Sequence, residues 1–151
     1  MKPFEYFIQL KEVNKISPDF ELAKSLLSEV ETRIEIAFEM KLNEKRARVI
    51  FELIYDSIRE LIDIILSIEG FKSYSHEANI SYLSKFKEFE TVELMELNRF
   101  RRIRNSSKYY GKPAQLEDAV EIKKAFPKIR EKLMKIINSK LSNQKWTYNF
   151  I

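Results

Sequence analysis

Apolar positions recur at helical spacing early in the chain, after a short mixed start. The segment Ser17-Pro18-Asp19 offers a capping residue, a proline suited to the first helical position and an early acid. The pattern predicts a helix from Ser17 to about Leu42, with one apolar stripe that faces a core. The stripe consists of Leu22, Leu26, Val30, Ile34, Ala37 and Phe38.

A second apolar stretch, from Glu44 to Glu69, predicts a long helix that ends at Gly70, because glycine readily takes the left-handed conformation that closes helices. Its apolar residues cover more than one face, which requires a central place in a bundle or contact with another subunit. We expect both, with a homodimer formed about a two-fold axis. The apolar residues are Val49, Ile50, Phe51, Leu53, Ile54, Tyr55, Ile58, Leu61, Ile62, Ile64, Ile65, Leu66 and Ile68.

Three further helices are predicted downstream, over about 76–86, about 91–110 and about 115–140. Ser75 and the Thr91 hydroxyl are the expected caps of the first two, and Pro127 is expected to bend the third. The predicted fold is therefore all-α, an antiparallel bundle of four to five helices.

This bundle is expected to occupy residues 17–140, between an N-terminal leader (1–16) and a C-terminal tail (141–151). A length of 151 residues suits one such domain, and 2 Gly and 4 Pro leave little turn chemistry for a large sheet.

Composition narrows the chemistry that the domain can support. The chain has no cysteine and a single histidine, His76, which excludes disulfides and multi-histidine metal centres, so we expect no metal and no cofactor. The acid pairs Glu52 with Asp56, and Glu60 with Asp63, are expected to be solvated or ion-paired with Arg59 and its neighbours. No apolar run is long enough to span a membrane and no signal-peptide pattern is present, so we predict a cytoplasmic protein.

The basic excess of the chain, a formal net charge of +4, is concentrated between Asn98 and Lys112, where six cations occur without an acid. On helical spacing, one side of this segment carries Arg101, Arg104, Asn105 and Lys108, and another side, with Phe100, Ile103 and Ser107, can face the core. Cations at the end of a helix also complement its dipole, by about 0.3 to 1 kcal/mol each, which is a purely structural alternative.

Three segments of the chain resemble the HEPN family of small helical proteins. The run Lys15-Ile16-Ser17-Pro18-Asp19 with the helix after it is similar to the opening of the family's first helix, and Tyr74-Ser75-His76-Glu77-Ala78 is similar to the entry to its third. Arg104-Asn105 resembles the start of the family signature, in which a histidine follows after four to six further positions. Here those positions fall on Tyr109, Tyr110 and Gly111, so the histidine is missing.

The resemblance implies a dimer that binds RNA or a nucleotide. Family members with the complete signature resemble metal-independent ribonucleases with two sites paired across a dimer cleft. It also implies a toxin–antitoxin pairing with a minimal nucleotidyltransferase that modifies a tyrosine in or beside the signature. The residues expected to bind the anion are Arg101, Arg102, Arg104, Asn105, Lys108, Tyr109, Tyr110 and Lys112.

Two other functions stay open at this stage. One is a non-catalytic module for protein interaction and dimerisation. The other is a metal-independent ribonuclease with a substituted base, for which Arg104 and Tyr109 are the catalytic candidates. A tyrosine, with an ordinary pKa near 10, would need strong activation to act as the base. His76 could supply an imidazole from another helix, although a histidine in the first turn of a helix is more often a local cap or a packing residue.

Overall fold

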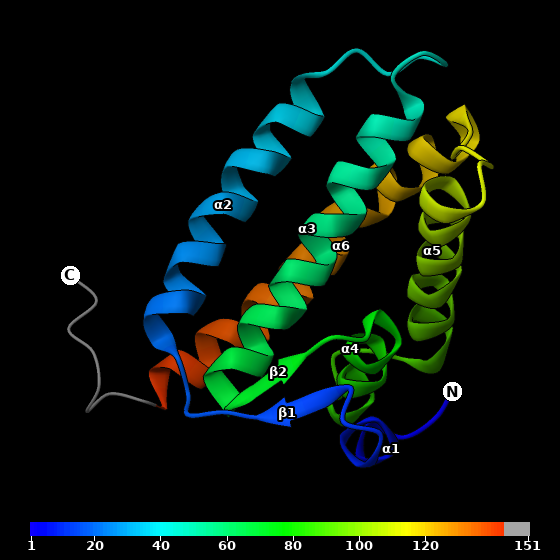
Figure 1. Cartoon of the computed structure of the whole chain (residues 1–151). Coiled ribbons are helices and arrows are strands. Elements are labelled where there is room, and N and C mark those ends of the chain that lie inside the picture. The colour runs from blue at the N-terminus through cyan, green and yellow to red at the C-terminus, as the bar shows by residue number, and fades with distance from the viewer. Residues whose placement is uncertain (144–151) are drawn as a thin grey trace.

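A computed structural model of the chain describes residues 1–143, which form a mostly helical fold with one short sheet (Figure 1). The elements, in chain order, are α1 (Phe4–Gln9), β1 (Val13–Lys15), α2 (Phe20–Glu39), α3 (Ala47–Glu69), β2 (Phe71–Ser73), α4 (His76–Tyr82), the 3-10 turn η1 (Leu83–Lys85), α5 (Thr91–Tyr109) and α6 (Leu116–Ser142). The prediction of a helical fold is confirmed. The predicted C-terminal tail lies, from residue 144 on, outside the described residues.

Helix α3 is the centre of the fold. It packs against α2 and α6 along its length, and it also contacts α4, α5 and β2 (Figure 1). Ile54, Ile58 and Ile65 are almost completely buried, whereas Val49 remains 46% exposed. The wide apolar surface of this helix is therefore covered mainly by the chain itself. Its breadth no longer argues for a subunit contact, and the homodimer stays a prediction.

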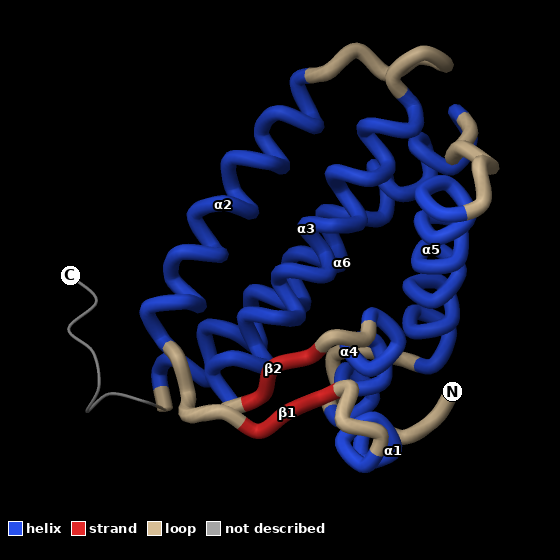
Figure 2. Tube along the Cα trace, in the orientation of Figure 1, coloured by secondary structure: helices blue, strands red, loops and turns tan. Residues whose placement is uncertain are grey.

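The first 16 residues contain two elements that the apolar pattern did not predict. Strand β1 pairs antiparallel with β2, with Val13 opposite Ser73, and Figure 2 shows this small sheet beside α4 and α1. Phe4 and Phe7 of α1 are buried, and the Ser81 hydroxyl donates a hydrogen bond to the carbonyl oxygen of Lys2 at 2.7 Å. The expected leader is thus packed against the sheet and α4.

Two predicted helix boundaries are confirmed at the level of the residue. Gly70 ends α3 with φ 87, in the left-handed region. Ser75 caps α4, because its hydroxyl oxygen accepts a hydrogen bond from the backbone N–H of Ala78 at 3.1 Å. This cap fixes the direction in which α4 leaves β2, and His76 is the first residue of the helix.

The expected caps of two other helices were wrong. Helix α2 begins at Phe20 rather than near Ser17, because the Asp19 carboxylate accepts from the backbone N–H of Leu22 at 3.0 Å. Helix α5 is capped by Glu90 together with Glu93, whose side chains bond each other's backbone N–H groups, and not by the hydroxyl of Thr91. Carboxylates hold these N-terminal N–H groups and also complement the helix dipole.

The last described helix continues through Pro127 to Ser142, beyond the predicted end near residue 140. Within residues 1–143, no helix is both long and apolar enough to cross a membrane.

Candidate functional site

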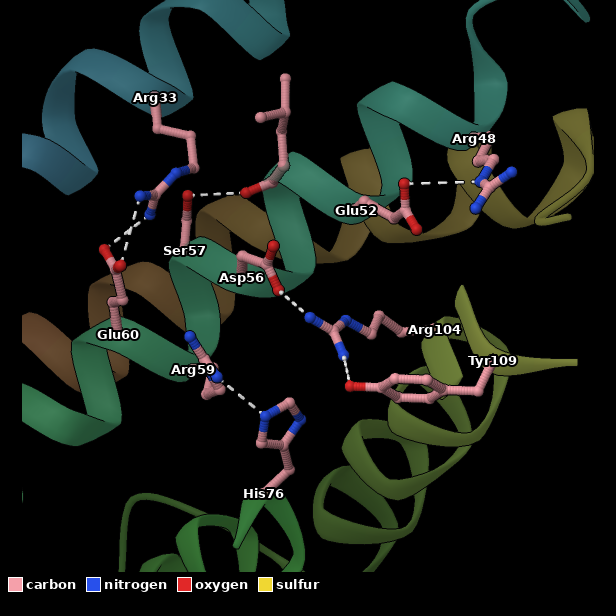
Figure 3. A network of polar contacts seen from close by, with 11 residues as sticks. Arg33, Arg48, Glu52, Asp56, Ser57, Arg59, Glu60, His76, Arg104 and Tyr109 are labelled. Atoms are coloured by element: carbon pink, nitrogen blue, oxygen red, sulfur yellow. Dashed lines mark hydrogen bonds and ion pairs between the residues drawn. The ribbon is translucent and has the colours of Figure 1, made fainter. Parts of the chain in front are cut away.

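Three helices bring a group of nitrogen-rich side chains together where the second half of α5 meets α3 and the start of α4. We define the His76 cluster as Arg59 of α3, His76 of α4, and Arg101, Arg104 and Lys108 of α5. The three helices contact one another pairwise, and Figure 3 shows Arg59, His76 and Arg104 facing the space between them. Side chains from separate parts of the sequence thereby share one electrostatic environment.

Arg104 is the most deeply buried cation of the cluster, with only 5% of the residue exposed. Its Nη2 atom lies 3.3 Å from Oδ1 of Asp56 on α3, and its Nη1 donates to the Tyr109 hydroxyl at 3.5 Å (Figure 3). The Tyr109 ring also lies beside the guanidinium, with its centroid 5.9 Å away. The ion pair and the ring together make burial of this charge tolerable.

The sequence prediction placed Arg104 on an outward side of α5, and this was wrong. Positions 100, 104 and 107 follow helical spacing, and in the structure Phe100, Arg104 and Ser107 are all buried, while Ile103 is only half-buried. The core face of α5 is therefore rotated toward Arg104. Lys108 is exposed and Arg101 is half-buried, so these two cations lie at the edge of that face.

His76 accepts a hydrogen bond through Nε2 from Nη1 of Arg59, at 2.8 Å, since a guanidinium can only donate (Figure 3). Burial is the largest cause that lowers the pKa of His76, from its ordinary 6.5 to about 4, and the charges of Arg59, Arg104, Arg101 and Lys108 lower it further. The imidazole is therefore neutral near pH 7. Burial also raises the pKa of Tyr55, whose ring centroid lies 6.0 Å from that of His76, so this phenol stays protonated.

Positive charge exceeds negative charge in the cluster. Among the residues that the structure describes, Asp56 is the one carboxylate that forms an ion pair with a cation of the cluster. Arg101 instead donates from Nε to the side-chain oxygen of Asn98, at 2.8 Å. Arginine binds phosphate through paired N–H donors, so a net positive, partly buried group of this kind can hold a phosphate.

The eight residues expected to bind an anion separate into two groups. Arg101, Arg104 and Lys108 belong to the His76 cluster, and Tyr109 contacts Arg104 directly. Asn105 is half-buried, whereas the three remaining residues are exposed, and in the described part of the chain no side-chain hydrogen bond or ion pair joins any of these four to the cluster. The three exposed residues are Arg102, Tyr110 and Lys112.

Sequence reasoning missed Arg59 and Asp56 as members of this site. The signal that could have found them was the presence of both charges within the most apolar helix of the chain, three positions apart. The acids of α3 were expected to be solvated or ion-paired with Arg59 and its neighbours, and Arg59 itself donates to His76. Of those acids, Glu60 pairs with Arg33 at 2.6 Å, and Glu52 lies 3.6 Å from Arg48. Asp63 accepts a hydrogen bond from Asn79 at 2.8 Å.

Within residues 1–143, no three His, Cys, Asp or Glu side chains are arranged so that they could hold a metal ion.

Comparisons with known proteins found no match among protein-family models, curated proteins or solved structures. The resemblance to the HEPN family therefore stays a prediction.

Proposed function

We propose that this protein binds phosphate groups of RNA or of a nucleotide through the His76 cluster, in the cytoplasm. One observation carries the proposal: four cations from α3 and α5 lie around the His76 imidazole, and in the described part of the chain Asp56 is the one carboxylate that forms an ion pair with any of them. Asp63 offsets part of the charge of Arg59. Cations held close together repel one another, which costs stability. A bound phosphate would offset this excess of positive charge. Phosphate contacts supply most of the affinity of proteins for nucleic acids.

Tyr109 extends this site toward a base, and Tyr110 follows it in the chain. Tyr109 is 65% exposed and Tyr110 is 74% exposed, at the C-terminal end of α5. A tyrosine ring can stack on any base, which would add affinity without sequence preference. The site would therefore bind single-stranded RNA or a nucleotide rather than a duplex.

The test compares two neighbouring arginines that carry the same charge. Arg101→Gln should weaken the binding of a short single-stranded RNA by about three- to tenfold at low salt. It should also reduce the slope of log affinity against log salt concentration by roughly one, because one fewer counterion is released. Arg102→Gln removes an equal charge outside the cluster and should have a much smaller effect. Fluorescence anisotropy across a salt series measures both quantities.

Equal losses in the two variants would mean that only general charge attracts RNA, and the proposal would fail. No RNA binding by the wild-type protein at low salt would instead favour the alternative of a protein-interaction module. Arg104→Ala is a poor first test, because truncation of this buried side chain would leave Asp56 without its partner.

A homodimer and a toxin–antitoxin pairing with a nucleotidyltransferase belong to this proposal as its biological setting. The exposure of Tyr109 and Tyr110 is compatible with the modification of a tyrosine by such a partner. Sedimentation at several protein concentrations tests the dimer.

A second candidate function, a metal-independent ribonuclease, is favoured by the position of His76. The Nε2 lone pair of this neutral imidazole is engaged by Arg59, so His76 could take a proton from a 2′-hydroxyl only after Arg59 turns to the bound phosphate. The 2′-oxygen would then attack the phosphorus, and the 5′-oxygen would leave with a proton from solvent. The lowered pKa of His76 makes it a weak base for this step. RNA cleavage in the presence of a chelator, abolished by His76→Asn with RNA binding retained, would support this function. A broad RNA pool that stays intact would exclude it.

A further inference from the structure

The ion pair between Arg104 and Asp56 leaves hydrogen-bonding capacity unused on both sides. Nη2 of Arg104 and Oδ1 of Asp56 are 3.3 Å apart, close enough for an ion pair. Within the described residues, however, the buried Oδ1 of Asp56 and the buried Nε of Arg104 have no hydrogen-bond partner. Asp56 therefore offsets the charge of Arg104 without fully satisfying its donors. A better acceptor could replace it.

The Asp56 side chain also lies closer to solvent than the Arg104 side chain with which it pairs. It is 29% exposed, although the Oδ1 atom that faces Arg104 is buried, whereas the side chain of Arg104 is only 6% exposed. The residue lies one turn before Arg59 on α3, on the side where the cluster forms (Figure 3). A ligand that binds Arg104 must therefore compete with this carboxylate and then lie close to it.

The charge of the ligand decides this competition. An internal phosphodiester carries one negative charge, as the carboxylate does, so exchanging one for the other brings no gain in charge at Arg104. A terminal phosphate carries nearly two charges near pH 7 and has three strong acceptor oxygens. It can replace the carboxylate on Arg104 and still attract Arg59, Arg101 and Lys108.

We propose that Asp56 is a specificity-determining residue, which occupies Arg104 in the free protein and admits ligands with a terminal phosphate in preference to phosphodiesters. This inference rests on the proposed function and names the chemical group that the site selects. The terminal phosphate can belong to the end of an RNA chain or to a mononucleotide, since both present the same dianion.

The test measures the affinity of wild-type protein and of Asp56→Asn for one short RNA with and without a 5′-phosphate. The wild type should bind the phosphorylated RNA about tenfold more tightly. Asp56→Asn should bind the unphosphorylated RNA about tenfold more tightly than the wild type does, so that the preference for the 5′-phosphate largely disappears. Competition by a nucleoside monophosphate against the labelled RNA shows whether a mononucleotide also serves as a source.

The matched control is Glu52→Gln, which removes an equal charge one turn earlier on α3, where Glu52 faces Arg48. This variant should keep the preference for the 5′-phosphate. The tighter binding of unphosphorylated RNA by Asp56→Asn should also require Arg104. The double variant Asp56→Asn with Arg104→Gln should therefore lose this increase in affinity. Asp56→Ala is the second charge-removing variant if the asparagine variant does not fold.

The two proposals fail in distinguishable ways. If the wild type binds RNA but shows no preference for the 5′-phosphate, or if Asp56→Asn and Asp56→Ala keep that preference, the role of Asp56 is refuted and the binding function stands. If neither the wild type nor an Asp56 variant binds any of the RNAs or the mononucleotide at low salt, both proposals are refuted.

Discussion

His76 and Asp63 are two partly buried groups whose titrations oppose each other. Burial lowers the pKa of His76 to about 4, and burial raises the pKa of Asp63 from its ordinary 3.8 to about 6. Between about pH 6.5 and 4 the unfolded chain binds a proton at the histidine that the native state does not bind. Over nearly the same range the native state binds a proton at Asp63 that the unfolded chain lacks. As pH falls, the histidine lowers the stability and the aspartate raises it.

Variants of these two residues should therefore shift the stability in opposite directions. Relative to wild type, His76→Gln should become more stable as pH falls from about 6.5 to 4, and Asp63→Asn should become less stable. Because both groups retain some contact with solvent, each change should be on the order of 1 kcal/mol. Urea unfolding at several pH values measures it. Parallel curves for wild type and both variants would contradict the assigned shifts.

The candidate site could be predicted only in part from the sequence, and Arg104 is an example. The cationic run of α5 is evident in the sequence, and helical spacing relates its members to one another. Spacing alone does not give the angle at which a helix meets its neighbours, so the burial of Arg104 was missed. Its partner Asp56 and the neighbour Arg59 lie about 45 residues earlier in the chain, and only the packing of α5 on α3 brings them close.

At the scale of elements, the junction of α3 with β2 is more restricted than the turn after α5. Gly70 has φ 87, and a Cβ atom placed there would lie 2.8 Å from the carbonyl oxygen of Ile16. Gly111, with φ 65, has no atom within 4 Å of such a Cβ. Both glycines take a conformation that other residues adopt with difficulty, but only Gly70 lies against another part of the chain.

Substitution of the two glycines should separate these effects. Gly111→Ala should lower the free energy of unfolding by about 1 kcal/mol, the cost of the left-handed conformation. Gly70→Ala should lower it by about 2 to 4 kcal/mol, since the backbone of Ile16 must also move. Denaturant titration provides both values, and an equal loss in the two variants would mean that the contact with Ile16 is unimportant.

Long elements were predictable because their apolar periodicity extends over several turns, as in α2, α3 and α6. Helix α1 and strand β1, with six and three residues, are too short to establish a period. Strand β1 is also stabilised by a partner near residue 72 rather than by its own sequence. The small sheet therefore became apparent only in the structure.

At the scale of the whole molecule, the N-terminal segment belongs to the core. The ring of Phe4, which is 2% exposed, lies 5.3 Å from that of Phe71 and 4.8 Å from that of Tyr82, measured between centroids. These contacts join α1 to β2 and to α4, the helix that carries His76. Damage to the N-terminal packing should therefore reach the candidate site.

Phe4→Ala should lower the free energy of unfolding by about 3 to 5 kcal/mol, because it leaves a cavity between α1, β2 and α4. Tyr6→Ala, two positions later on a more exposed side of α1, should cost much less. Thermal unfolding of both variants tests this expectation. A small loss for Phe4→Ala would indicate that the segment contributes little to the core.

The pairing of β1 with β2 has a consequence for how the chain acquires its fold during synthesis. Val13 cannot meet Ser73, nor Lys2 meet Ser81, until β2 and α4 have left the ribosome. Until then the aromatic side chains of α1 have no surface to cover them. The residues of α1 thus emerge well before the surface on which they dock, and a chaperone that shields exposed aromatic groups would find its substrate in this helix.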